Sequence, residues 1–154
     1  MPGQYAKTTE VSPEKTLSEI RAVLNRYGAD EFAMREQQDR VGVGFKMRQR
    51  MVLLEAKLPA KKDFSRTPER GIARTASQTQ AAYDQAVRQV WRALFLVIKS
   101  KLESVESGIE TFEEAFQAQL VLPSGQTVGE WIAPQVARAY ETGSMPPLLP
   151  DGAR

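Results

Sequence analysis

The sequence predicts an α+β fold in which three antiparallel strands, with a short fourth strand as an alternative, pack on a long central helix. Three observations support this class. Apolar residues recur at helical spacing up to residue 27, alternate with polar residues between residues 32 and 58, and return to helical spacing over residues 76–107. A chain of 154 residues is expected to fold as one domain around a single hydrophobic core.

The domain is expected to span residues 12–143, between a flexible arm of residues 1–11 and a proline-rich tail of residues 144–154. The Ser12-Pro13-Glu14 triplet has the order of an N-cap, a proline at the first helical position and an acid in the first turn. Gly28 supplies a stop signal. The first helix is therefore predicted to begin after Ser12 and to end before Gly28.

The alternating segment is expected to form three strands, because apolar side chains recur at every second residue: Phe32 and Met34; Val41, Val43, Phe45 and Met47; and Val52, Leu54, Ala56 and Leu58. The connections near residues 37–39 and at Arg48-Gln49 are short enough for β-hairpins, although neither contains the Asn-Gly pair that favours such turns. Residues 59–75 lack an apolar period and are predicted to form a long loop, a kind of segment that often carries function.

Residues 76–107 are predicted to form the central helix of the core. About thirty residues at 1.5 Å each would span about 45 Å, which is longer than a small domain needs, so a kink or an early end is expected. A short acidic helix should follow, and then a brief strand and a turn. The Thr127-x-x-Glu130 spacing of a capping box opens a last helix, which Pro134 is expected to bend or interrupt.

Two absences from the composition exclude several kinds of site. Without cysteine the chain has no disulfide, thiolate metal site or cysteine nucleophile, and without histidine it lacks the usual general base and the usual nitrogen ligand of zinc. No apolar run is long enough for a signal peptide or a membrane span. We therefore expect a soluble cytoplasmic protein with no cofactor, no metal site and a non-catalytic role.

Charge is distributed unevenly along the chain. The formal net charge is +6 over residues 35–74 and −5 over residues 100–154, within a total of +2. A basic middle and an acidic end present two opposite surfaces, unless the fold brings them together so that they neutralise each other.

The basic region predicts a surface that binds nucleic acid, with single-stranded DNA as the expected partner. In an antiparallel sheet with helices on one side, Arg35, Lys46 and Lys57 share the outward face, where Gly42 and Gly44 would let a backbone or a base approach closely. Cations along a sheet and a loop gain affinity for phosphates by releasing condensed counterions, and an exposed loop phenylalanine can stack on a base. The expected binding residues are Arg35, Lys46, Arg48, Arg50, Lys57, Lys61, Lys62, Phe64, Arg66, Arg70 and Arg74.

Two other interpretations of this region stay open. Outward cations also keep a sheet soluble and its edge from pairing, without binding anything. The Glu55-x-Lys57 order looks like the restriction-endonuclease-type nuclease core, in which an aspartate and a glutamate hold a divalent ion and a lysine orients the attacking water. Asp39 is the plausible partner aspartate. Because it should pair near residue 58 and has the opposite strand parity to Glu55, we expect the two carboxylates to point to opposite faces.

The remaining charged and apolar surfaces predict structural roles. The acids from Glu103 to Glu114 are expected to line an exposed helix side rather than to bind a metal ion or to imitate DNA. The long helix offers more apolar surface than a small sheet can cover, so self-association is plausible. A homodimer, or an accessory protein that acts through protein–protein interaction, is therefore the alternative to nucleic-acid binding.

Three stretches, VWRALFLVIKSKLESVESGIETFEEAF, TVGEW and GSMPPLLP, carry a resemblance to a family of small proteins from phages and prophage regions. The resemblance covers roughly residues 12–150. That family brings no established activity and no catalytic residues. What it implies is a setting in replication or recombination, in which nucleic acid is a common partner.

Overall fold

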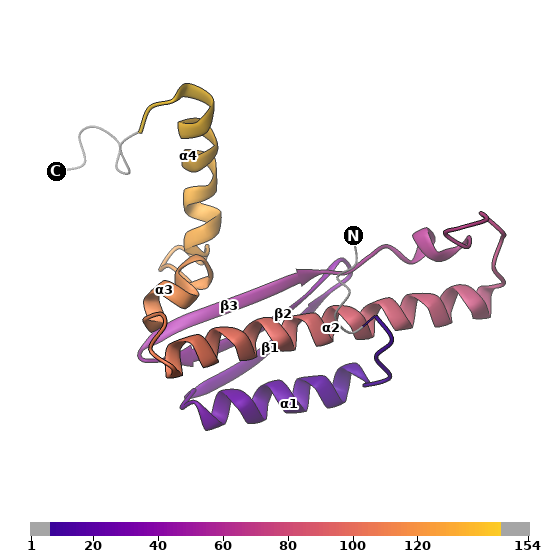
Figure 1. Ribbon diagram of the computed structural model, residues 1–154, viewed down its shortest axis with the longest axis horizontal. Coiled ribbons are helices and arrows are strands. Elements are labelled where there is room, and N and C mark those ends of the chain that lie inside the picture. Colours follow the sequence, from indigo (N-terminus) through magenta and orange to yellow (C-terminus); the bar gives the residue numbers. More distant parts are fainter. Residues whose placement is uncertain (1–6, 146–154) are drawn as a thin grey trace.

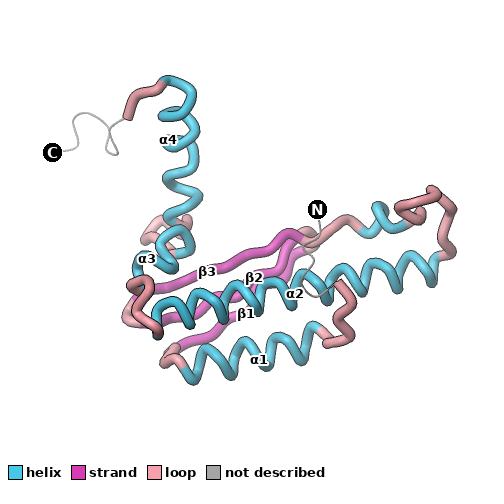
Figure 2. The backbone as a smooth tube through the Cα atoms, viewed as in Figure 1, coloured by secondary structure: helices cyan, strands magenta, loops and turns pink. Residues whose placement is uncertain are grey.

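The computed structural model describes residues 7–145 and confirms the predicted α+β class (Figures 1 and 2). A three-stranded antiparallel sheet packs against a long helix, with further helices around them. In chain order the elements are α1 (Pro13–Arg26), β1 (Glu31–Gln37), β2 (Arg40–Met47), β3 (Arg50–Lys57), the 3-10 helix η1 (Lys61–Phe64), α2 (Ala76–Glu106), α3 (Phe112–Phe116), the 3-10 helix η2 (Gln117–Gln119) and α4 (Val128–Thr142).

The first helix, α1, begins and ends where the sequence predicts. The Ser12 hydroxyl accepts a hydrogen bond from the Lys15 backbone N–H at 3.2 Å, and Pro13 occupies the first helical position. Gly28, with a φ of +90°, follows the end of the helix in a left-handed conformation that a residue with a Cβ would adopt only at a cost. Ile20 and Leu24 are fully buried and form the part of the core that α1 contributes.

The three strands pair in the order β1-β2-β3, and both connections are two-residue turns. We call the face that packs on α2 the inner face and the opposite one the outer face. Central β2 turns Val43 and Phe45 to the inner face, where both are fully buried. The turn from β2 to β3 has positive φ angles at Arg48 (48°) and Gln49 (61°), as a type I′ turn requires. This hairpin therefore forms without an Asn-Gly pair, with two bulky side chains in the left-handed region.

The central helix, α2, starts at a capping box between Thr75 and Gln78 and continues for 31 residues, so the expected early end does not occur. Its buried side chains, which form the centre of the core, are Trp91, Leu94, Ile98 and Leu102. Helix α1 lies beside α2 and runs in the same direction (Figure 1). Arg92 of α2 pairs with Glu19 of α1, and Tyr27 beyond the end of α1 donates to the Glu103 carboxylate at 3.0 Å.

Aromatic packing closes the end of the core where α2 finishes. The ring of Phe116 in α3 meets Phe45 edge-on at 5.7 Å and lies 5.1 Å from Phe112. A capping box between Thr111 and Glu114 starts α3. The expected fourth strand does not form within the described residues, because the segment after α3 makes only isolated bridges, one of them between Val52 and Leu120.

The two ends of the chain are described only in part. Thr9, within the expected flexible arm, accepts a hydrogen bond from Gln85 of α2 at 2.8 Å, and the expected tail beyond Met145 lies outside the described residues. Helix α4 opens on the predicted capping box at Thr127 and runs continuously through Pro134, so the expected interruption does not occur. Among the helices of residues 7–145, none is both long and apolar enough to cross a bilayer.

The type I′ turn makes a stability prediction. Replacing Gln49 by glycine should raise the free energy of unfolding by about 1 kcal/mol, because glycine adopts the positive φ without the clash of a Cβ. Urea unfolding should show a higher midpoint with an unchanged slope. Gln38→Gly in the other hairpin is the matched control. Gln38 does not have a positive φ, so there the substitution should lower stability. Equal effects at both sites would contradict this account.

Candidate nucleic-acid interface

Cross-strand pairing places the predicted cations on the outer face of the sheet. Arg35 lies opposite Gly42, and Gly42 lies opposite Glu55, so these three residues form one row across the sheet. Arg40 pairs with Lys57 in the next row, and Lys46 lies opposite Glu31 at the far end. The prediction that Arg35, Lys46 and Lys57 share one face is therefore confirmed.

Most of these outer-face cations already have a carboxylate partner. Glu55 contacts Arg35 at 3.5 Å and Arg40 at 3.6 Å, and Glu31 contacts Lys46 at 3.3 Å. Both partners of Glu55 are therefore arginines. All of these side chains are at least partly exposed, so each pair adds little stability, yet it lowers the positive potential that a phosphate would meet.

Gly42 makes room for this ion cluster rather than for a ligand. A Cβ built on Gly42 would lie 3.2 Å from the Glu55 side chain and 3.4 Å from a backbone carbonyl of β3. Glu55 therefore lies low across the middle of the sheet, between its arginine partners. A Cβ on Gly44 would meet the Ala33 side chain at an ordinary 3.8 Å, so Gly44 does not have this role.

Asp39 and Glu55 lie closer together than the sequence predicts. Asp39 belongs to the turn before β2, and its carbonyl accepts from Leu58 N–H at 2.7 Å, as the predicted register requires. The guanidinium of Arg40, however, contacts Asp39 at 3.3 Å and Glu55 at 3.6 Å. The expectation that the carboxylates point to opposite faces is therefore wrong, because a turn residue does not follow strand parity.

The bridging guanidinium bears on the nuclease interpretation. In that chemistry two carboxylates hold a divalent cation between them, whereas here the cation between Asp39 and Glu55 is Arg40. Over residues 7–145 no cluster of three or more acidic side chains is arranged to hold a metal ion. Arg40 also lowers the pKa of the Asp39 carboxyl, mainly by donating hydrogen bonds to it, and Asp39 in turn raises the pKa of Arg40.

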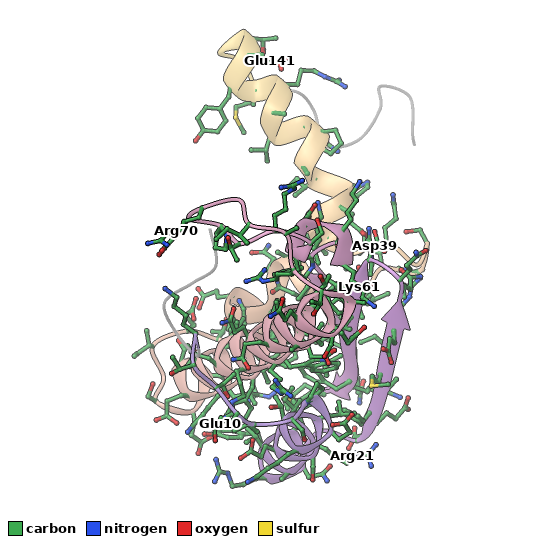
Figure 3. The ribbon with its side chains drawn as sticks, turned by 90° about the vertical axis from the view of Figure 1, so that its right-hand side faces the viewer. Glu10, Arg21, Asp39, Lys61, Arg70 and Glu141 are labelled. Atoms are coloured by element: carbon green, nitrogen blue, oxygen red, sulfur yellow. The ribbon has the colours of Figure 1, made fainter. Side chains whose placement is uncertain are left out.

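The loop between β3 and α2 is ordered, and two of its arginines hold it in shape. The Arg66 guanidinium donates to the Gly71 carbonyl at 2.8 Å, and Arg74 donates to the carbonyls of Phe64 at 3.1 Å and Arg66 at 3.2 Å. Lys61, Lys62 and Arg70 are exposed and make no ion pair within the described part of the chain. Figure 3 looks onto this end of the molecule, with Lys61 near Asp39 and Arg70 well apart from both.

Phe64 is not a free platform for a base. It is half-buried, and its ring meets Tyr83 of α2 edge-on at 6.1 Å. This contact fixes η1 on the side of α2. Phe64 was predicted to stack on a base because its neighbours in the sequence are basic. The sequence does not show that Tyr83, far along the chain, packs against its ring.

Arg48 and Arg50 lie at the opposite end of β3 from Lys57. Seven residue steps along a strand correspond to about 24 Å, so these arginines and the loop lysines do not form one cluster. Arg48 also packs over the ring of Phe112 at 5.6 Å. The predicted cations therefore divide into two groups. Lys46, Arg48 and Arg50 form a turn group, since Lys46 pairs with Met51 next to Arg50. At the N-terminal end of α2 lies a group that we call the basic end: Arg35, Lys57, Lys61, Lys62 and Arg70, together with Arg40, which was not among the predicted residues, and with Arg66 and Arg74 supporting it from within the loop.

An apolar groove beside the basic end has no counterpart in the sequence predictions. It has a volume of about 950 Å³ and lies between residues 54–59, η1 and residues 86–97 of α2. It opens because Val97 and Leu96 are on the side of α2 that the narrow sheet does not cover, where they are 43% and 36% exposed. The sequence does show that the long helix has more apolar surface than a small sheet can cover. That excess is the signal from which an open groove could have been predicted.

Comparisons of the chain with protein-family models, with curated proteins and with solved structures found no match. The candidate site therefore stands on the geometry and charges described above.

The Arg40 bridge makes a prediction about pH. Arg40→Gln should move the pKa of Asp39 upward, towards the ordinary value of an aspartate, because it removes the hydrogen bonds that lower it. A carboxyl whose pKa is depressed by folding stabilises the folded state above its unfolded pKa of about 3.9, and this contribution is lost as the pH falls through the lower folded value. The stability difference between wild type and variant should therefore shrink below about pH 4.

A carboxyl-detected NMR titration of Asp39 measures this effect directly. Lys46→Gln is the control, since Lys46 pairs with Glu31 and does not contact Asp39. An Asp39 pKa that is the same in wild type and Arg40→Gln would show that the bridge does not exist in solution.

Proposed function

We propose that this protein binds nucleic acid without catalysis, with single-stranded DNA as the ligand class, through the basic end. The observation that carries the proposal is the separation of charge along α2. The loop at its N-terminal end, residues 59–75, has five lysines and arginines against two acids, whereas residues 103–114 at its C-terminal end have five glutamates and no basic residue.

The length of α2 keeps these opposite charges from cancelling. A helix of 31 residues spans about 46 Å at 1.5 Å per residue. Exposed charges are screened over about 8–10 Å at physiological ionic strength, so the glutamates do not neutralise the basic end. The first turn of α2 contains no acidic side chain, and its dipole adds positive potential at the same end. The acidic end should repel phosphates and so favour one orientation of the ligand.

The shape of the basic end favours a flexible strand over a duplex. The cations follow the sheet edge at Lys57, turn at η1 with Lys61 and Lys62, and continue to Arg70 on the far side of the loop (Figure 3). Duplex DNA is stiff over about 150 base pairs and would meet only part of this bent path. A single strand can bend along it, so that successive phosphates meet successive cations.

The resemblance to phage and prophage proteins supports the same proposal. Proteins of that setting handle DNA during replication or recombination, and a single strand is exposed in both processes. We therefore place the proposed binding in phage-type replication or recombination.

Fluorescence anisotropy of a labelled oligonucleotide tests the proposal. About four phosphate contacts, from Lys57, Lys61, Lys62 and Arg70, predict a slope of about −3 when the logarithm of the binding constant is plotted against the logarithm of salt concentration. Lys61→Glu with Lys62→Glu should abolish binding at moderate salt. A duplex of the same length should bind more weakly.

Lys15→Glu with Lys99→Glu is the matched control, because both lysines are exposed and lie away from the basic end, and the change in net charge is the same. Arg50→Glu tests whether the turn group takes part, and it should have a smaller effect than either loop lysine. Binding that does not respond to salt, or that falls equally in the control, would overturn the proposal.

A further inference from the structure

The first described residues lie against α2 and lead towards the apolar groove. The side-chain amide of Gln85 donates to the Thr9 carbonyl at 2.8 Å, and that of Gln89 donates to the Lys7 carbonyl. Gln89 lines the groove, whereas Gln85, one helical turn earlier, does not. The chain therefore approaches the groove as it is followed from Thr9 back to Lys7, and residues 1–6 continue from its rim.

The groove is within reach of residues 1–6. Six extended residues span at most about 20 Å, and the wall that residues 86–97 of α2 form is about 16 Å long. Tyr5 lies two residues before Lys7, which is at most about 7 Å along the chain. Ala93 lies about 6 Å further along the helix axis than Gln89, and Val97 about 12 Å. The Tyr5 ring can therefore lie over this wall while Lys7 stays at Gln89.

The composition of residues 1–6 suits an apolar groove. The segment reads MPGQYA and contains no charged side chain. The wall of α2 presents Val97 and Leu96, which are 43% and 36% exposed. An uncharged segment can enter without the cost of desolvating an ion, and a tyrosine can bury its ring while its hydroxyl stays at the rim.

The opposite wall of the groove is the free edge of β3, which calls for a polypeptide backbone. The Met51 carbonyl accepts from Val121 N–H at 2.8 Å on the side of β3 away from β2. Backbone groups of successive residues in a strand alternate between its two sides, so Glu55 and Lys57 direct theirs to the same edge. Over residues 7–145 no backbone group outside the strands bonds to them. An extended segment in the groove can pair with this edge, as an added strand does.

We propose that residues 1–6 lie extended in the groove of their own molecule, with the Tyr5 ring against Ala93 and Val97 and the backbone along β3. The occupant comes from the same molecule because Lys7, two residues from Tyr5, is held at the rim. The segment covers apolar surface that the narrow sheet leaves open, so any other ligand of the groove must displace it. This contact does not depend on nucleic-acid binding.

Cysteine cross-linking tests the contact, because the chain has no cysteine. Under mild oxidation, Tyr5→Cys with Val97→Cys should form an internal disulfide in the monomer. Tyr5→Cys with Val136→Cys is the matched control. Val136 is 45% exposed against 43% for Val97, but it lies on α4, which points away from α2 (Figure 1). The control should give at least about tenfold less internal disulfide in the same time, because its effective concentration is lower.

Urea unfolding tests whether the Tyr5 ring is buried. Tyr5→Ala should raise the equilibrium constant of unfolding about tenfold, as exposing an apolar side chain does. In a Val97→Ala background the same change should have a smaller effect, because side chains in contact are coupled. Tyr140→Ala is the control. It removes the same kind of ring from a site where the side chain is 89% exposed, so stability should not change.

Three results would refute the proposal. Equal yields of internal disulfide from the two cysteine pairs would show that residues 1–6 have no fixed place in the groove. Disulfide-linked dimers of the first pair, in place of the internal link, would show that the segment lies on a second copy. Equal effects of Tyr5→Ala and Tyr140→Ala would show that the Tyr5 ring is not buried. None of these results bears on binding of single-stranded DNA, which is measured separately.

Discussion

The packing of a 31-residue helix on strands of seven or eight residues determines the layout of this molecule. The helix is about 46 Å long and the strands about 25 Å, so α2 must extend past the sheet. The ordered loop covers the N-terminal extension, where Phe64 meets Tyr83. At the other end α3 places Phe116 against Phe45 of the sheet. The oppositely charged segments are kept apart because each is attached to its own end of α2.

The sheet is also narrow compared with the surface that α2 offers. Its inner face covers Leu94 and Ile98, but Leu96 and Val97 remain exposed on the neighbouring side. This shortfall creates the groove.

The sequence predicts most of this architecture because the determining signals are local. The serine, proline and acid at residues 12–14 start α1, and the spacing of Thr127 and Glu130 starts α4. Strand parity places Arg35, Lys46 and Lys57 on one face because side chains alternate regardless of distant residues. The apolar period also predicts the span of α2, but it does not predict that the helix runs to its end without stopping early, since an overhanging helix is stable only when other segments cover it.

The candidate site was harder to predict because it depends on contacts between distant segments. Arg40 bridges two carboxylates that are 16 residues apart in sequence, Asp39 and Glu55. Arg66 and Arg74 are loop arginines like Arg70, yet they donate to backbone carbonyls, whereas Arg70 makes no such contact with the residues between 7 and 145. Composition does not distinguish a cation that holds a loop from one that faces solvent. An apolar helix face likewise has the same pattern whether its partner is the same chain or another molecule.

The position of α2 after the whole sheet in the sequence affects how the protein is made. Because α2 follows all three strands, a nascent chain that has reached residue 75 contains α1 and the sheet but not the helix that covers them. Val43, Phe45 and Leu54 then lack their main cover. Exposed apolar strands are prone to aggregate before a core closes. The interval in which the ribosome adds the next 31 residues is therefore when the unfinished polypeptide most needs a chaperone.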